Sequence, residues 1–360
     1  MLYELFREKP LVVAGPCSAE TPEQLYQTIL KIKAENPNIE LFRAGIWKPR
    51  TRPNSFEGVG QVGLDWFLDI KKELNLKTTV EVATPQHVEQ ALKKEVDILW
   101  IGARSSVNPF TVQEIADALK GTNVPVMVKN PINPDLALWI GAIERIMGAG
   151  IEQVAAIHRG FSYYGKGKYR NEPMWQIALD FKGQFPKIPL IGDPSHIAGK
   201  RELLLELAQR MMDLRYDGLM IETHIDPQNA WSDAAQQLTP TDLKLLLSQV
   251  QVRKETFDDD FYTNKLRQMR EQIDLIDQEI VNHLAKRTEL IRQIGIYKQE
   301  NNVAIFQPKR WNEIKQTRPN WGKAQNLESD FILMLYKLIH DESIRLQTEE
   351  NSEGSIEGNN

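Results

Sequence analysis

The sequence has 360 residues, and its hydrophobic content of 41% and charged content of 26% are typical of a soluble globular protein. The formal net charge of −5 argues against general binding to nucleic acid or to a membrane surface, and no apolar stretch approaches the roughly 20 residues of a membrane span. The single cysteine, Cys17, excludes an intrachain disulfide, and the charged N-terminus lacks the apolar core of a signal peptide, so we expect a cytoplasmic protein.

Short apolar runs that end at a polar or reactive residue recur along the first two thirds of the chain. The eight runs are 11–17, 41–45, 78–83, 98–104, 125–130, 154–160, 189–196 and 218–224. Segments with apolar residues at helical spacing separate them, for example 22–35 and 199–214. This alternation of strand and helix predicts an α/β protein with a (β/α)8, or TIM, barrel. Such barrels carry their chemistry at the C-terminal ends of the strands.

Residues at or beyond three of these strand ends form a mixed set of metal-ligand types: Cys17, His196, Glu222 and Asp233. Each alone has a simpler explanation, such as a buried structural thiol for Cys17 or a solvated carboxylate for Asp233. The first, seventh and eighth strands are neighbours in a closed barrel, so we expect the four side chains to converge. A thiolate, an imidazole and two carboxylates suit a divalent first-row ion such as Mn, Fe, Co or Zn.

Six cationic side chains also lie at or just past strand ends: Arg43, Lys48, Arg50, Arg104, Lys129 and Arg159. A solvated surface charge is the simplest explanation for any one of them. Arginine binds carboxylate and phosphate through paired N–H donors, and lysine adds a point charge. As a set, the six cations predict a substrate with several negative charges, or two anionic substrates.

The chain beyond the barrel pattern is predicted to be helical. The eighth barrel helix is expected at 239–255, and a polar break follows at 258–260. From about 261 to 299, apolar residues recur in steps of three, four and seven. This pattern predicts an amphipathic helix on the order of 55 Å long, which requires a partner helix.

Shorter helical patterns follow at 308–316 and 327–347, and the polar tail 349–360 is expected to be disordered. The predicted organisation is a barrel domain at 1–256, a linker at 257–262, a small all-α domain at 263–348 that dimerises, and the tail at 349–360.

Residues 11 to about 240 resemble the metal-dependent 3-deoxy-D-arabino-heptulosonate-7-phosphate (DAHP) synthases. The matching strings are 14-AGPCS-18, 42-FRAGIWKPRT-51, 102-GARS-105, 128-VKNP-131, 157-IHRG-160, 192-GDPSH-196, 221-IETH-224 and 231-WSDAAQQL-238. The resemblance implies condensation of phosphoenolpyruvate with erythrose 4-phosphate, which gives DAHP and phosphate at the first step of the shikimate pathway of aromatic amino-acid biosynthesis.

The resemblance also implies a role for each candidate residue. The implied ligands of a divalent ion, Mn2+ or another first-row metal, are Cys17, His196, Glu222 and Asp233. The implied binders of phosphoenolpyruvate are Arg104, Lys129 and Arg159, with Arg43 and Lys48 beside them. The implied binders of erythrose 4-phosphate are Arg50 and Thr51. Lys129 is in addition a candidate proton shuttle.

One related enzyme is an alternative for the barrel. The 3-deoxy-octulosonate 8-phosphate synthases share this arrangement and use arabinose 5-phosphate. They carry a Lys-Ala-Asn-Arg string where this chain has 48-KPRT-51, so we prefer the four-carbon sugar.

Residues 263 to about 347 resemble the all-helical chorismate mutases. The matching strings are 269-MREQIDLIDQEIVNHLAKRTELIRQIGIYK-298, 309-KRW-311 and 339-IHDESIRLQ-347. The resemblance implies rearrangement of chorismate to prephenate without a metal or nucleophile. The implied substrate-binding residues are Arg270, Arg287, Lys298, Arg310, Ser343 and Gln347. Lys298 and Gln347 would stabilise charge that develops on the ether oxygen.

Family members often carry acidic residues where this chain has Gln307 and Trp311, so the mutase affinity and rate are expected to differ. Two interpretations of the helical domain follow. It is a second enzyme, or it is a non-catalytic regulatory module that senses chorismate or prephenate. Lys298 and Gln347 favour the enzyme, and a catalytic pocket can also serve as an allosteric effector site for feedback control.

The spacing of two predicted mutase residues predicts a shared site. Arg270 and Lys298 are 28 positions apart, on the order of 42 Å along one helix, so one chorismate cannot touch both from a single helix. We therefore expect Arg270 to come from a partner's antiparallel helix, which makes the protein at least a dimer.

Overall fold

The computed structural model describes residues 2–7, 10–48, 56–165, 167–254, 256 and 258–357, with side chains described as far as Glu349. The chain divides into two compact units, Met1–Glu255 and Thr256–Asn360. This division falls within one residue of the boundary expected after residue 256.

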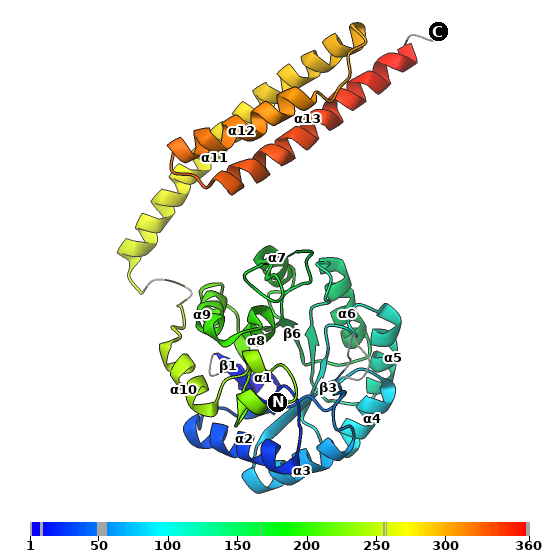
Figure 1. Ribbon diagram of the computed structural model, residues 1–360, viewed down its shortest axis with the longest axis vertical. Coiled ribbons are helices and arrows are strands. Elements are labelled where there is room, and N and C mark those ends of the chain that lie inside the picture. Colours follow the sequence, from blue (N-terminus) through cyan, green and yellow to red (C-terminus); the bar gives the residue numbers. More distant parts are fainter. Residues whose placement is uncertain are drawn as a thin grey trace. The chain divides into compact units, whose positions relative to one another are not determined.

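The first unit contains a closed barrel of eight parallel strands in chain order, with β1 paired to β8 (Figure 1). The strands are β1 (Leu11–Gly15), β2 (Leu41–Arg43), β3 (Lys77–Val82), β4 (Ile98–Ile101), β5 (Val126–Lys129), β6 (Val154–His158), β7 (Leu190–Gly192) and β8 (Gly218–Glu222). Each strand falls within or overlaps one of the eight apolar runs, so the predicted (β/α)8 fold is confirmed.

Helices surround the barrel. They are α2 (Pro22–Glu35), α3 (Val62–Leu74), α4 (Pro85–Lys93), α5 (Pro109–Leu119), α6 (Leu136–Gly148), α7 (Trp175–Gln184), α8 (Pro194–Ala198), α9 (Leu204–Asp213) and α10 (Pro240–Gln249). Several helices begin in the same way. The side chain of a Thr or Asn just before the helix accepts a hydrogen bond from a backbone N–H of the first turn, and a proline follows it at the start of the helix. Thr21, Thr84, Asn108 and Thr239 are such caps.

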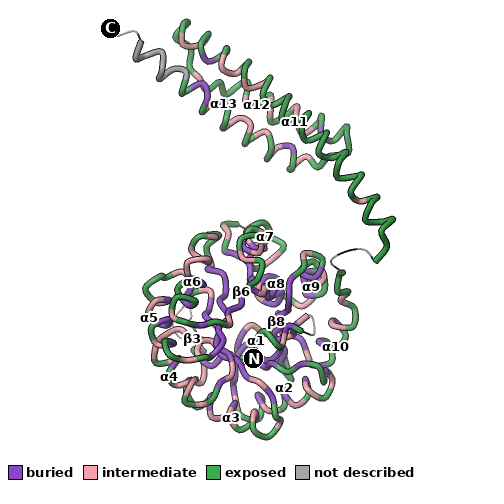
Figure 2. The backbone as a smooth tube through the Cα atoms, turned by 180° about the vertical axis from the view of Figure 1, so that it is seen from behind, coloured by how far each residue is buried: buried purple, intermediate pink, exposed green. Residues whose placement is uncertain are grey.

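Two apolar clusters form the core of the barrel unit. One fills the barrel interior and includes Val13, Trp100 and Met127. The other lies between the strands and the surrounding helices (Figure 2). The short helix α1 (Leu2–Leu5) closes the N-terminal end of the barrel, because Leu2 and nearby Phe6 are buried in the interior cluster. The apolar clusters leave the opposite end of the barrel, at the C-terminal ends of the strands, to polar side chains.

The second unit consists of α11 (Asp260–Glu300), α12 (Pro308–Ala324) and α13 (Ser329–Glu357). The long helix expected from about 261 to 299 is confirmed. A Cβ on Gly295 would lie 3.2 Å from Gln347 Cγ, which is tighter than an ordinary van der Waals contact, so this glycine favours close packing of α13 against α11. The first turns of α11 extend beyond α12 and α13 (Figure 1).

Some predicted element ends were wrong. The helix expected at 239–255 ends at Gln249, and α11 begins at Asp260, inside the expected linker. Helix α13 continues to Glu357, so the expectation of disorder from residue 349 is not met up to that residue. The tail up to that point has no proline, and its glutamates are good helix formers. Among the described helices, none is long and apolar enough to cross a membrane.

Candidate active sites in the barrel and in the helical unit

Polar side chains from six strands and the loops that follow them gather at the C-terminal end of the barrel. We call this set the barrel site, and its members are Cys17, Arg43, Lys48, Lys129, Arg159, Asp193, His196, Glu222 and Asp233. All but Asp193 were predicted from the sequence. The strand ends bring them together because β1 and β8 are paired, with Gly15 opposite Glu222.

The predicted metal ligands meet in this site. One sulfur or oxygen atom from each of Cys17, Glu222 and Asp233 lies within 4.8 Å of the others. Cys17 Sγ is 3.4 Å from Asp233 Oδ2, and His196 Nε2 is 3.6 Å from Glu222 Oε1. The four groups therefore converge as the sequence predicted.

The electrostatics of these groups fit a bound cation. Glu222 is fully buried, and its Oε1 accepts no hydrogen bond from the residues that the structure describes. Burial acts to raise the pKa of Glu222, but His196 and Arg43 outweigh it and the pKa is lowered. Burial, with the nearby Glu222 carboxylate, raises the pKa of the Cys17 thiol to about 11. A divalent ion would stabilise both the thiolate and the buried Glu222 carboxylate.

Asp193 organises two of the predicted residues and was missed in the sequence. Its Oδ2 lies 2.8 Å from Lys129 Nζ and 2.8 Å from His196 Nδ1. Its Oδ1 accepts the backbone N–H of His196, which caps α8. The carboxylate therefore lies beside the Nδ1 edge of the His196 ring, and Nε2 is on the side of Glu222. The string 192-GDPSH-196, with an acid directly after β7, was the available signal.

Arg43 has unused hydrogen-bond capacity at the centre of the site. It is 1% exposed, its guanidinium lies 5.1 Å from the centre of the Trp100 ring, and its Nη2 lies 3.2 Å from Glu222 Oε1. Its Nε and Nη1 are buried and have no acceptor among the described residues. Buried donors without acceptors are rare in proteins, so these two N–H groups indicate a site for an anion.

The other predicted cations differ in exposure. Arg159 is buried, and burial lowers its pKa to about 10. Arg104 is exposed, and its charge contributes to this lowering of the Arg159 pKa. Lys48 Nζ lies 3.0 Å from Cys17 Sγ and donates to the Cys17 carbonyl at 2.9 Å. Arg50 and Thr51 lie outside the described residues, so their role stays a prediction.

A second cluster lies where α11 and α13 pack together. We call it the helical site, and its members are Arg287, Lys298, Ser343 and Gln347. Arg287 Nη1 donates to Ser343 Oγ at 2.8 Å, and Lys298 Nζ donates to Gln347 Oε1 at 2.9 Å. Burial lowers the pKa of Lys298 and of Arg287. Four of the six predicted mutase residues are therefore together in one chain.

The other two are not joined to this cluster by hydrogen bonds. Arg310 is half-exposed and donates to Glu313 at 2.6 Å. Arg270 is exposed on the early part of α11. Trp311 stacks on His340 with ring centres 4.2 Å apart. His340 was not predicted, because a lone histidine in a helical pattern carries no distinctive signal.

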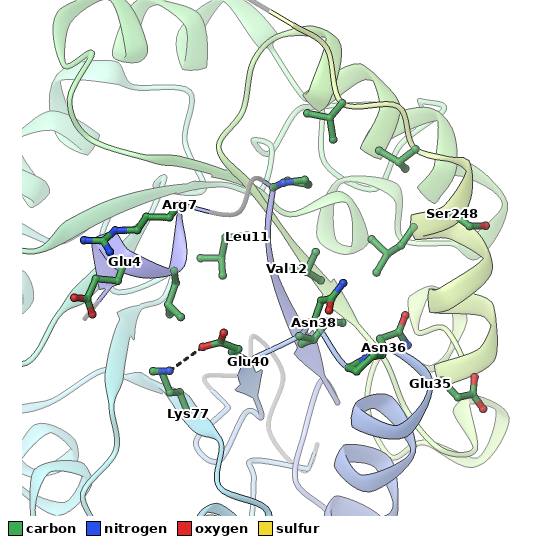
Figure 3. A pocket seen from close by; sticks show the side chains of 17 residues that line it. Glu4, Arg7, Leu11, Val12, Glu35, Asn36, Asn38, Glu40, Lys77 and Ser248 are labelled. Carbon is green, nitrogen blue, oxygen red and sulfur yellow. Dashed lines mark hydrogen bonds and ion pairs between the residues drawn. The ribbon is translucent and has the colours of Figure 1, made fainter.

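A cavity of about 700 Å³ lies at the other end of the barrel, at the N-terminal ends of the strands (Figure 3). Leu11 and Val12 line it, and Lys77 and Glu40 form an ion pair of 2.9 Å at its edge. None of the predicted site residues lines it, and in barrels of this class this face serves stability.

Comparison with known proteins assigns a family to each of the two units. Residues 7–258 match the DAHP synthetase I family, so the chain belongs to that family. Residues 269–348 match the type II chorismate mutases. The chain is therefore a fusion of a DAHP synthase, a transferase, with a chorismate mutase, an isomerase.

Individual relatives match the barrel unit. A phospho-2-dehydro-3-deoxyheptonate aldolase of Thermotoga maritima is 27% identical over 247 residues, which are 69% of this chain and 70% of its own length. A 2-dehydro-3-deoxyphosphooctonate aldolase of Helicobacter pylori is 28% identical over 267 residues, which cover 67% of this chain and 94% of the aldolase. The crystal structure of the T. maritima DAHP synthase gives a TM-score of 0.58 at 25% identity, covering 66% of this chain and 67% of its own.

Proposed function

We propose that the barrel site binds a divalent metal ion through Cys17, His196, Glu222 and Asp233 and condenses phosphoenolpyruvate with erythrose 4-phosphate beside it. The observation that carries this proposal is the convergence of the thiol and two carboxylates within 4.8 Å, with the His196 ring next to Glu222. A bound Mn2+ or other first-row ion would supply a Lewis acid for the aldehyde oxygen of the sugar.

The cations of the site hold the two anionic substrates together. Arg43 offers two buried N–H donors, and Arg159 adds a desolvated guanidinium for the carboxylate or phosphate of phosphoenolpyruvate. Exposed Arg104 adds positive charge near Arg159, and partly buried Lys48 adds positive charge beside Cys17. Two anions repel each other in water, so fixing them in one geometry lowers the barrier to their reaction. Lys129, held by Asp193, is placed to move a proton.

The choice of sugar tests this proposal directly. Consumption of phosphoenolpyruvate by the purified Mn2+-loaded chain should be measured with erythrose 4-phosphate and, in a parallel sample, with arabinose 5-phosphate. The 48-KPRT-51 string predicts turnover with the four-carbon sugar only. Preference for arabinose 5-phosphate would favour the octulosonate alternative.

The helical site is proposed to rearrange chorismate to prephenate. Arg287 and Ser343 lie together to bind a carboxylate, and Lys298 and Gln347 lie together as donors for the ether oxygen. Chorismate loss should therefore be measurable with the purified chain and should be nearly abolished in Lys298→Ala. A wild-type chain that binds chorismate without converting it would favour the purely regulatory interpretation.

Dimerisation is proposed to complete the helical site. A row of apolar side chains on α11 is half-exposed in the single chain: Met269 49%, Ile273 54%, Ile276 56%, Ile280 52% and Leu284 40%. Such a row needs a covering partner. Arg270 and Lys298 lie on the same continuous helix, so an antiparallel α11 of a second chain would bring its own Arg270 to the site.

Regulation of the enzyme and its location in the cell are two further proposals. Occupation of the helical site by chorismate or prephenate is proposed to exert feedback control on the condensation. A cytoplasmic location is supported by the single cysteine, whose thiol the barrel site requires in its reduced form.

A further inference from the structure

The described parts of the segment between β6 and α7, residues 159–165 and 167–174, contact the barrel site. Phe161 and Glu172 form an antiparallel bridge in which each backbone N–H donates to the carbonyl of the other at 2.8 Å. The backbone N–H groups of Arg170 and Asn171 donate to the carbonyl of Ile197 at 3.0 and 3.2 Å. Ile197 belongs to α8, the helix of the predicted histidine ligand, so the segment is fixed to that helix.

The side chain of Asn171 lies between the anion-binding and the metal-binding parts of the site. It is 9% exposed. Its Oδ1 accepts a hydrogen bond from Arg159 Nη1 at 2.8 Å, and its Nδ2 donates to the His196 carbonyl at 2.6 Å. Gly160, with φ of +77°, permits this approach, since a Cβ there would lie 3.0 Å from Asn171 Cβ.

The chemical type of the side chain matters at this position. Arg159 is buried, so its N–H groups need acceptors. A carboxylate would accept equally well, but it would also neutralise the guanidinium that an anionic substrate must bind. The amide oxygen of Asn171 accepts the hydrogen bond without adding charge, and the amide N–H group is still available for the His196 carbonyl.

We propose that Asn171 is a positioning residue of the condensation, holding the guanidinium of Arg159 at a fixed place relative to His196. Phosphoenolpyruvate is thereby bound at a defined distance from the metal ion, and loss of the amide weakens its binding more than that of the metal. This inference rests on the proposed function of the barrel site.

Two variants and one control test it in the full-length chain. Asn171→Ala removes both hydrogen bonds. Asn171→Asp is isosteric, keeps the acceptor, loses the donor and adds a charge beside Arg159. Lys168→Ala is the control, because Lys168 lies in the same segment but is exposed and pairs with Glu206. The readouts are phosphoenolpyruvate affinity of the chelated protein by calorimetry, Mn2+ affinity without substrate, and KM against kcat at saturating Mn2+.

Loss of the Asn171 amide should weaken the affinity for phosphoenolpyruvate much more than the affinity for Mn2+. In Asn171→Ala, the Kd and the KM for phosphoenolpyruvate should both rise about tenfold, because hydrogen bonds to charged groups are among the stronger ones. In Asn171→Asp, both should rise at least as much. The Mn2+ affinity of Asn171→Ala should stay within about threefold of wild type. The reason is that the Asn171 side chain contacts only the backbone carbonyl of His196 and not its ring. Lys168→Ala should bind both ligands normally.

Other outcomes would overturn the inference. Wild-type phosphoenolpyruvate binding in both Asn171 variants would show that Arg159 needs no positioning. Equal losses of phosphoenolpyruvate and Mn2+ binding would show a general structural role instead. If Asn171→Ala does not fold, the isosteric Asn171→Asp decides. A wild-type chain that binds neither ligand would contradict the proposed function itself, which is a distinguishable failure.

Discussion

Cys17 Sγ lies 3.4 Å from Asp233 Oδ2, although 216 positions separate the two residues in the chain. Closure of the barrel explains the contact, because β1 pairs with β8 and each residue follows one of these strands. A metal ion bound between them would therefore connect the two ends of the barrel sequence. It should bind only the closed barrel and stabilise it.

Removal of one proposed metal ligand should weaken metal binding without unfolding the barrel. We expect Asp233→Asn to weaken Mn2+ binding by about 100-fold, at the upper end of losses known around metal sites, with the barrel still folded. Asp226→Asn is a matched control, because Asp226 also follows β8 but its carboxylate accepts from Asn229 instead. Equal Mn2+ affinities for the two variants, by titration of the chelated protein, would contradict the ligand assignment.

Asp193 should control the barrel site through its charge. Asp193→Asn keeps a capping side chain for α8 but removes the anion that Lys129 and His196 share, so Mn2+ affinity should fall about 10- to 100-fold. The condensation rate at saturating Mn2+ should also fall. Asp135→Asn, at the N-cap of α6, is the control for the same exchange at an exposed cap. Unchanged metal affinity in Asp193→Asn would refute this role.

Barrel stability should depend on pH through His158. This buried ring donates from Nε2 to the Pro173 carbonyl and accepts at Nδ1 from the Tyr216 hydroxyl, and burial lowers its pKa to about 4. The pKa of His158 is 6.5 in the unfolded chain and about 4 in the folded chain, so between these values only the unfolded chain binds the proton. The contribution of His158 is therefore fully present above pH 6.5 and is lost as the pH falls through this window.

The loss should reach about 2 kcal/mol between pH 7 and pH 5. Urea unfolding of the barrel at the two pH values, in wild type and in His158→Gln, measures it. The variant should be less stable at pH 7 and should show a smaller difference between the two pH values. His283→Gln, on α11, is the control. An unchanged pH difference in His158→Gln would rule out this ring as the cause.

The mutase activity should recover in mixed dimers. Arg270→Ala and Lys298→Ala should each be nearly inactive. A mixed dimer has one site with both lesions and one site with neither, so random reassembly of the two variants should restore about a quarter of the wild-type rate. If mixed dimers demonstrably form and no activity returns, the two residues act within one chain and the shared-site proposal is wrong.

The fold and the convergence of the proposed metal ligands could be predicted from the sequence because both depend on local patterns. Each strand is a short apolar run, and Cys17, Glu222 and Asp233 lie at or beyond the ends of such runs. Asp193 and Asn171 were missed because their roles depend on contacts with Lys129 and Arg159, which only the folded barrel brings into reach.

The helical unit was predicted less completely. Periodicity located α11, but it did not show that Arg310 pairs with Glu313 or that Trp311 stacks on His340. These contacts depend on side-chain conformations at the helix surface, where several rotamers satisfy the same pattern. The end of α13 was also missed, because a polar segment without proline is compatible with either helix or coil.

One chain is proposed to carry two reactions at separate sites, of which only the barrel reaction needs a metal. The most direct test is to measure both activities in one chelated, full-length sample before and after addition of Mn2+. Condensation of phosphoenolpyruvate with erythrose 4-phosphate should be absent until Mn2+ is added, while chorismate should be converted at the same rate throughout. Full condensation activity in the metal-free protein, or a mutase activity that disappears and returns with the metal, would contradict it.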